Sequence, residues 1–165
     1  MLRILGIDPG TNITGIGIID VDDSIIKYIY HEALKTGIKN KYSHKLASIN
    51  TTVEKVIKQY KPEQVAIESV FFSVNAATAI KLGQARGAAL AACSVRSCEI
   101  YEYSPRKVKL IITGNGASDK TELQKKVKRI LKIRRNLELD ASDALAVAIC
   151  HGIILKENPE TISSI

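Results

Sequence analysis

Three stretches near the N-terminus have the hydrophobic pattern of β-strands. Residues 2–8 form a short apolar run that ends in a carboxylate. Residues 13–21 alternate Ile with Gly or polar residues, and residues 24–34 are rich in Ile and Tyr. Such alternation and such side chains are typical of strands. The polar residues 22–24 predict a hairpin turn between the second and third strands.

The central part of the chain alternates between helical and strand patterns. Residues 42–60 place apolar side chains at steps of three and four, which predicts an amphipathic helix. The run 64–68 predicts a buried strand, the Ala-rich residues 75–96 a helix, and residues 98–103 a fifth strand. A hairpin followed by β-α-β crossovers gives a mixed sheet with helices on its faces. We therefore expect an α/β fold.

The last third of the chain is predicted to be helical. Residues 105–112 follow a serine cap and begin with proline, which favours a short helix. Ser118 is expected to cap a second helix that runs to about Ile133. The final helix covers residues 140–156. Because no internal repeat or linker is evident, residues 1–165 are expected to form one domain.

The composition narrows the class of partner. A formal net charge of +7 favours an acidic partner such as nucleic acid or an anionic membrane face. No stretch reaches the roughly 18 apolar residues of a membrane-spanning helix, and the N-terminus lacks the pattern of a signal peptide. We expect a cytoplasmic protein without a membrane partner. The three cysteines show no paired spacing, which favours buried thiols over a zinc site.

Four acidic residues occupy positions where a carboxylate needs an explanation. Asp8 and Glu68 each end an apolar strand, where burial is costly unless the group is hydrogen-bonded or bound to a cation. Asp140 and Asp143 are three residues apart and share one helix face. If these elements meet, the acids converge and suit Mg²⁺ or Mn²⁺. Two such ions about 3.5–4 Å apart can support phosphodiester cleavage.

Each acid also has a plainer interpretation. Asp140 can act as a helix cap, with Asp143 favourable near the positive end of the helix. Asp8 precedes Pro-Gly and can be a turn residue. Glu68 is harder to explain in this way, because acids are depleted from strands. The joint arrangement of the four favours a metal site.

Four segments carry a specific combination of motifs, and they are ILGIDPGTNITGIGIID, IESVFFSVNAATAIKLGQARGAAL, NGASDKTELQKKVKRIL and DASDALAVAICH. In this order and spacing they resemble the RuvC family of bacterial Holliday junction resolvases over essentially the whole chain. The first segment alone also resembles the opening of actin-like and sugar-kinase proteins. LGQARG together with DASDALAVA makes the resemblance specific.

The resemblance implies a ribonuclease H-like fold with a mixed five-stranded sheet flanked by helices. It implies a homodimer that nicks two opposing strands of a four-way DNA junction during recombination and repair, alongside the RuvA–RuvB branch-migration complex. Asp8, Glu68, Asp140 and Asp143 match the family's four metal-binding catalytic acids. The implied cofactor is Mg²⁺, with two ions per site, and Mn²⁺ is expected to substitute.

The resemblance also assigns basic and aromatic residues. Lys109 and Lys120 match residues of the family implicated in phosphate contacts and activity, and Phe71 matches an aromatic that contacts an unpaired base near the crossover. Lys125 and Lys128 lie on the same basic helix as Lys120 and are expected to contact backbone phosphates. The alternatives are a solvated helix face for the lysines and core packing for Phe71.

Gly83 and Gly87 interrupt the Ala-rich helix at a spacing of four residues. Each costs up to about 1 kcal/mol relative to Ala, so their presence implies a close backbone approach. The approach can be to the sheet or to a second subunit, and the family resemblance favours the subunit.

Three rival functions remain. An ATP-dependent kinase or chaperone-type ATPase needs two lobes and far more chain, and no GxxxxGK[ST] loop is present. A junction-binding module without catalysis is disfavoured because all four acids are present. The third rival is another nuclease of the ribonuclease H fold, acting on RNA–DNA hybrids or another intermediate.

Overall fold

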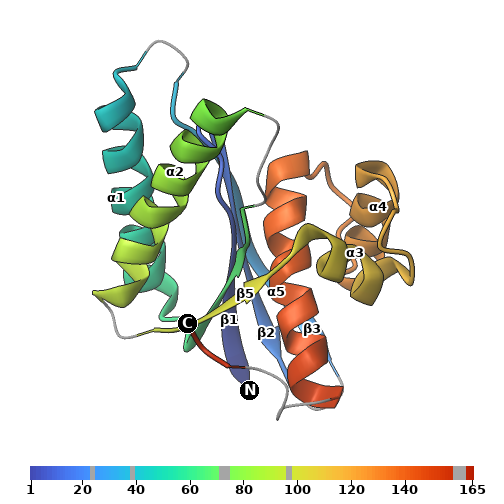
Figure 1. The fold of residues 1–165 in the computed structure, drawn as a ribbon. Helices are drawn as coiled ribbons and strands as arrows, with labels where there is room; N and C mark the ends of the chain where they lie inside the picture. The colour runs from blue at the N-terminus through green and yellow to red at the C-terminus, as the bar shows by residue number, and fades with distance from the viewer. Residues whose placement is uncertain (23–24, 38–39, 71–74, 96–97, 158–162) are drawn as a thin grey trace.

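A mixed five-stranded sheet forms the centre of the described chain (Figure 1). The computed structural model describes residues 1–22, 25–37, 40–70, 75–95, 98–157 and 163–165. The strands are β1 (Leu2–Asp8), β2 (Ile13–Val21), β3 (Ile26–Lys35), β4 (Gln64–Glu68) and β5 (Glu99–Tyr103). They lie in the order β3-β2-β1-β4-β5, with β1, β2 and β3 antiparallel and β1, β4 and β5 parallel. The predicted mixed sheet is confirmed.

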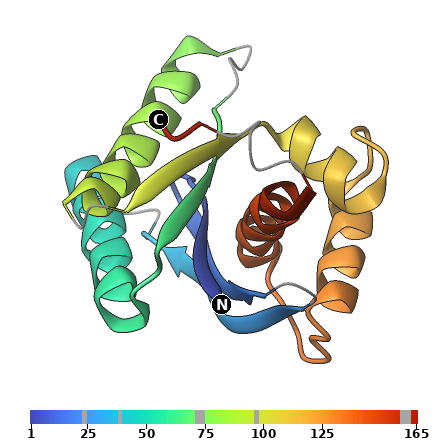
Figure 2. The ribbon, with the colours of Figure 1, turned by 90° about the horizontal axis from the view of Figure 1, so that it is seen from below.

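Helices cover both faces of this sheet (Figure 2). The helices are α1 (Tyr42–Tyr60), α2 (Ala76–Ser94), α3 (Pro105–Thr113), α4 (Lys120–Ile130) and α5 (Leu139–Glu157). Helices α1 and α2 pack on one face, and α5 lies on the other against β1 and β2. Helices α3 and α4 pack on the outer side of α5, which is therefore enclosed and buried along most of its length. No described helix is long and apolar enough to cross a lipid bilayer.

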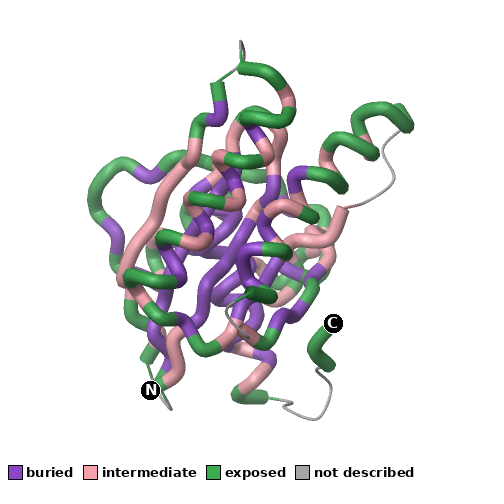
Figure 3. Tube along the Cα trace, turned by 90° about the vertical axis from the view of Figure 1, so that its left-hand side faces the viewer, coloured by how far each residue is buried: buried purple, intermediate pink, exposed green. Residues whose placement is uncertain are grey.

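Two apolar clusters form the core, one on each face of the sheet, and the buried segments lie toward the middle of the molecule (Figure 3). Successive side chains of a strand point to opposite faces, so Ile4 of β1 packs with α5 while Leu5 packs with α1 and α2. In β4, Ala66 lies on the α5 side and Ile67 on the other. Asp8 lies two residues after Gly6 and four after Ile4, so it is on the α5 side of β1. Glu68 lies two residues after Ala66 and is on the same side of β4.

Three glycines bring α5 unusually close to the sheet. A Cβ atom at Gly6 would lie 2.0 Å from the carbonyl oxygen of Ala144. At Gly15 it would lie 1.9 Å from the carbonyl oxygen of Asp140, and at Gly17 2.7 Å from the side chain of Leu145. Glycine weakens a strand interior, and close approach of another backbone is one reason to keep it there. This contact fixes the height of α5 above the sheet.

The boundaries of α4 differ from the prediction. Asp119, and not Ser118, caps the helix, since its Oδ1 accepts a hydrogen bond of 2.8 Å from the backbone N–H of Glu122. Ser118 is buried and its hydroxyl accepts from Thr113 instead. With Asp119 as the cap, Glu122 occupies the third position, which is the sequence pattern of a capping box. The sequence interpretation was therefore wrong by one residue.

The same helix ends at Ile130 and not at Ile133. Lys132 has a φ of 55° and the backbone N–H of Ile133 donates to the carbonyl of Lys128 at 2.9 Å. This left-handed residue after the last turn closes the helix by a Schellman arrangement. Smaller shifts occur elsewhere: β3 begins at Ile26, and the predicted turn 22–24 lies partly outside the described residues.

For Gly83 and Gly87 the sequence left two alternatives open, the sheet and a second subunit. A Cβ atom at either position would meet nothing within 4 Å in the described chain, and both residues are exposed. The sheet is therefore not what these glycines approach. They lie on the outward face of α2, together with the exposed side chain of Ile80, and the exposed Val95 caps the end of the helix.

Candidate active site

Asp8 and Glu68 leave the sheet side by side. Strands β1 and β4 are parallel neighbours in which Ile7 pairs with Ile67, and the acids are the next residues of each strand. Carboxyl ends of parallel strands meet at one edge of a sheet, which is where sites form in α/β folds. The predicted meeting of the two strand-end acids is confirmed.

The first turns of α5 lie over the same edge. Gly15 pairs with Asp8 across β1 and β2, and the carbonyl of Asp140 rests against Gly15. Asp143 follows one turn later and is only 7% exposed. The close contact between helix and sheet therefore places both acids of α5 near the ends of β1 and β4.

A lysine from a third element enters this group. Lys120 is the first residue of α4, and its Nζ donates to Oδ2 of Asp143 at 2.8 Å. The hydrogen bond to Asp143 is the main reason that the pKa of Lys120 is raised. The cap at Asp119 orders the turn that carries Lys120, so that the ammonium group is held by a fixed helix end.

The side chains line a cavity of about 140 Å³. Its charged lining consists of Asp8, Glu68, Asp143, Lys109 and Lys120. The apolar remainder comes from Pro105, Val108 and Leu123 of α3 and α4. Asp140 is not among the lining residues, but its charge raises the pKa of both Asp8 and Asp143.

The carboxylates are crowded and desolvated. Burial, followed by the charges of Glu68 and Asp143, raises the pKa of Asp8 to about 8. Burial and the charge of Asp143 raise the pKa of Glu68 to about 7. The pKa of Asp143 is also raised by burial, although the hydrogen bond from Lys120 opposes the shift. Full ionisation of these carboxylates is therefore unfavourable without a further cation.

The donor set fits a hard cation. Carboxylate oxygens are the ligands that Mg²⁺ and Mn²⁺ prefer, and a cation would relieve the repulsion that raises these pKa values. The ammonium group of Lys120 already acts as a cation within the cluster. In the described chain, however, no three His, Cys, Asp or Glu side chains are already arranged to hold one metal ion.

The remaining predicted site residues lie around this cavity or outside the described chain. Lys109 comes from α3 and lines the cavity. Lys125 is exposed on α4 and Lys128 is half-buried, while the opposite side of α4 packs through Leu123. Phe71 lies outside the described residues.

Two features escaped the sequence analysis. The glycines that admit α5 were noticed only as part of a strand pattern, although glycine at Gly15 and Gly17 marks one face of β2. His151 is fully buried, with Nδ1 2.6 Å from the Tyr103 hydroxyl and Nε2 3.0 Å from Oε1 of Gln64. It ties α5 to β4 and β5 behind the site.

A sequence model of the family described as "Crossover junction endodeoxyribonuclease RuvC" matches residues 4–151. This chain belongs to the RuvC family. RuvC from Xylella fastidiosa (strain 9a5c) is 44% identical over 153 residues, which are 92% of this chain and 88% of that protein. The structure "T. thermophilus RuvC in complex with Holliday junction substrate" has a TM-score of 0.92 at 29% identity and covers 100% of both chains. A second Thermus thermophilus RuvC structure has a TM-score of 0.88 at 28% identity, over 99% of this chain.

These comparisons confirm the resemblance and the ribonuclease H-like fold predicted from it. The match to RuvC spans all five strands and reaches into α5 as far as His151. It therefore includes both strand-end acids, the basic helix α4 and the two acids of α5.

Proposed function

We propose that this protein is a structure-selective endonuclease that resolves four-way DNA junctions by paired, metal-dependent nicks. The observation that carries the proposal is the convergence of Asp8, Glu68 and Asp143 on one cavity with Lys109 and Lys120. Membership of the crossover junction endodeoxyribonuclease family supports the reaction class. The Thermus thermophilus relative whose structure holds a Holliday junction supports the substrate.

The proposed metal ligands are Asp8, Glu68, Asp140 and Asp143. Two Mg²⁺ ions, replaceable by Mn²⁺, would supply an activated water and stabilise the leaving oxygen. The chain itself supplies a dry floor at the strand ends, which strengthens electrostatic interactions in the cavity. Asp140 is not among the cavity-lining residues, but its charge acts on both Asp8 and Asp143.

Lys120 is proposed to be a catalytic residue. Its ammonium group lines the cavity beside Asp143, where it would face a phosphate bound at the carboxylates. A fixed positive charge there stabilises the charge that develops in the transition state. Lys109 belongs to α3 and also lines the cavity. It is proposed to hold the same phosphate or its neighbour.

Binding of the DNA beyond the cleavage point is assigned to other residues. Lys125 and Lys128 continue the basic surface of α4 away from Lys120 and suit contacts with successive phosphates. Phe71 is proposed to stack on an unpaired base, which is worth roughly 1–3 kcal/mol in single-stranded binding sites. This last assignment rests on the family motif.

The active form is proposed to be a homodimer. A four-way junction offers two equivalent strands, and one chain offers one cluster of four acids. The exposed residues of α2 include Ile80, which is 62% exposed, Gly83 and Gly87, and Val95, 75% exposed, caps the end of the helix. Small and apolar residues on one helix face suit close packing against a second copy.

Three further assignments complete the proposal. Residues 1–165 are taken to work as one domain, because α5, late in the chain, packs on β1 and β2 at its beginning. The enzyme is placed in the cytoplasm, where its DNA substrate would be. The RuvA–RuvB branch-migration complex is the proposed partner on the junction, following from the family.

The deciding experiment compares three substrates with and without Mg²⁺: a synthetic four-way junction, a linear duplex of the same sequence, and an RNA–DNA hybrid. We expect incision of the junction only, and only with the metal. Equal cutting of junction and duplex would contradict the resolvase proposal. Preference for the hybrid would favour another nuclease of this fold, and junction binding without incision would favour a non-catalytic module.

A further inference from the structure

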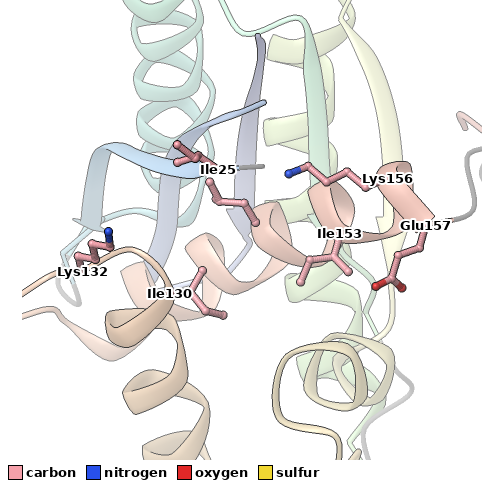
Figure 4. Close-up of a pocket in the computed structure, with 7 residues that line it drawn as sticks. Ile25, Ile130, Lys132, Ile153, Lys156 and Glu157 are labelled. Carbon is pink, nitrogen blue, oxygen red and sulfur yellow. The ribbon is translucent and has the colours of Figure 1, made fainter. Parts of the chain in front are cut away.

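An apolar groove lies at the other end of α5 from the acids. It has a volume of about 510 Å³, and its walls come from the β2–β3 hairpin, the end of α4 and the end of α5 (Figure 4). The lining residues are Ile25, Ile26, Ile130, Lys132, Ile153, Lys156 and Glu157. An adjoining hollow of about 310 Å³ shares four of these residues and adds Lys27, Tyr28 and Leu131. The two form one depression.

This depression is remote from the proposed active site. Leu2 pairs with Val21 at one end of β1, whereas Asp8 pairs with Gly15 at the other. The groove lies at the Val21 end. Along α5 the ten residues from Asp143 to Ile153 correspond to a rise of about 15 Å. Substitutions in the groove can therefore be tested without disturbing the acids.

The floor and the rim differ in chemistry. Side chains of Ile25, Ile130 and Ile153 converge from three elements, between Lys132 on one side and Lys156 on the other (Figure 4). Ile25 is 66% exposed, so its burial against a partner would be favourable. An apolar centre surrounded by charged residues is the usual anatomy of a protein–protein interface.

The charge of the rim selects the partner. Among the described residues that line it, Lys27, Lys132 and Lys156 are opposed by one acid, Glu157. Lys132 sits at a left-handed position, φ 55°, where glycine is favoured at the end of a helix. A lysine at this position adds a charge to the rim where glycine would suit the backbone better. The rim therefore complements acidic side chains.

We propose that this groove binds an acidic amphipathic helix of a partner protein. Apolar side chains at helical spacing would fill the isoleucine floor, and Asp or Glu on the flanks would pair with the lysines. Nucleic acid suits the groove less well, because a phosphate backbone would leave the isoleucines without apolar contacts. The site is separate from junction cleavage and would connect the enzyme to another protein.

The test uses two synthetic peptides of about 15 residues, close to the length at which isolated helices become marginally stable. One has a leucine face flanked by Glu, and the other has the same leucines flanked by Lys. Binding to the full-length protein is followed by fluorescence anisotropy. We expect the Glu-flanked peptide to bind at least tenfold more tightly. Equal binding, tighter binding of the Lys-flanked peptide, or no binding of either would overturn the proposal.

Variants locate the binding. Ile25→Glu and Lys156→Glu should each weaken the Glu-flanked peptide at least fivefold. The matched controls Ile165→Glu and Lys55→Glu, at exposed positions outside the groove, should not. Junction cleavage by all four should match the wild type, which shows that they are folded. Loss of peptide binding in the controls as well, or none in the groove variants, would place the peptide elsewhere.

Two further measurements distinguish an acidic peptide from nucleic acid as the ligand of the groove. Lys132→Gly should raise Tm, because glycine relieves the left-handed backbone, and yet weaken the Glu-flanked peptide. A variant that is more stable but binds less well cannot be explained by loss of folding; unchanged binding would exclude Lys132 from the rim and contradict the charge argument. Displacement of the peptide by duplex DNA from Lys125→Ala as readily as from the wild type would identify the groove itself as a nucleic-acid site and overturn the proposal.

Discussion

A Cβ atom at Gly15 would lie 1.9 Å from the carbonyl oxygen of Asp140, so the strand and the helix that carry the proposed ligands touch through their backbones. Gly15 is also the register partner of Asp8. One glycine therefore sets the distance between the acid at the end of β1 and the acids of α5. The site depends on the closeness of two backbones as much as on its charged side chains.

Gly15→Ala is predicted to abolish most junction cleavage although it removes no charged group. The added methyl group must push the first turn of α5 outward, at a cost of roughly 1–3 kcal/mol in unfolding free energy. Gly152→Ala is the matched control at the far end of α5, where the new Cβ would meet side-chain atoms and no backbone, those of Val21 at 2.9 Å and Ile4 at 3.6 Å. It should retain cleavage. If Gly15→Ala cuts like the wild type, the contact does not set the geometry of the acids.

Asp8→Asn is predicted to abolish cutting, to preserve junction binding and to stabilise the metal-free protein at pH 8. The folded-state pKa of Asp8 is about 8, against 3.8 for an unperturbed carboxyl group. The folded state therefore holds more protons between these values, and wild-type stability falls as pH rises from about 4 to about 8. The variant lacks this loss. The unfolding free energy of Asp8→Asn relative to the wild type should therefore be more favourable at pH 8 than at pH 5, by more than about 1.4 kcal/mol, the value of one pKa unit.

Urea unfolding at the two pH values, without metal and then with Mg²⁺, checks this. Mg²⁺ should stabilise the wild type more than the variant, because only the wild type has the complete set of acids. Glu68→Gln, Asp140→Asn and Asp143→Asn should likewise lose cutting and keep binding. An acid whose replacement leaves near-full activity would be a cap or turn residue.

Lys120→Ala is predicted to slow cleavage by about 10²-fold with little change in junction affinity, as for the loss of one group that stabilises transition-state charge. Lys125→Ala is the contrasting variant. It should keep the single-turnover rate but weaken binding, and lower the salt dependence of affinity by about one ion. Single-turnover kinetics and binding at several salt concentrations measure both. The same loss of affinity in both variants would make Lys120 a backbone contact.

The positions of the acids could be predicted from sequence because strand ends and helix spacing are local patterns. Asp8 and Glu68 each follow an apolar run, and Asp140 and Asp143 share one helix face. The ion pair between Lys120 and Asp143 could not, since it joins residues 23 apart on two helices. Its geometry depends on how α4 packs on α5, which no local pattern encodes.

The errors have the same origin. Ser118 and Asp119 are both good caps, and only the burial of Ser118 beside Thr113 decides between them. Gly83 and Gly87 signal a close approach, but a sequence does not say which body approaches. The exposed position of both glycines rules out the sheet and leaves the second copy as the proposal.

His151 is predicted to make the protein sensitive to acid. Burial lowers its pKa to about 4, from 6.5 for an unperturbed histidine. The unfolded chain therefore binds more protons between these values, and stability is lost as pH falls from about 6.5 to about 4. In His151→Gln this loss should shrink, although the variant should be less stable at pH 7 because the ring contacts with Tyr101 and Tyr103 are gone. Unfolding midpoints of the wild type and of His151→Gln at pH 7 and pH 5 test this prediction. The same change in midpoint between the two pH values in both proteins would contradict a neutral buried ring.

Gly87→Leu is predicted to weaken the dimer and to uncouple the two nicks. A Cβ atom at this exposed position would meet nothing within 4 Å in the described chain, so the monomer should tolerate leucine. Any loss must then come from contact with a second copy. Ala47→Leu, at an exposed position on α1, is the matched control and should leave the dimer intact.

Sedimentation velocity measures the association, and a junction labelled on both strands shows whether the second nick follows the first at once. In the wild type both incisions should occur within one lifetime of the complex, because two sites related by a two-fold axis face two equivalent strands. In Gly87→Leu singly nicked junctions should accumulate. Sedimentation of the wild type as a monomer, both free and on a junction, would contradict the dimer, and the two nicks would then require one site to act twice.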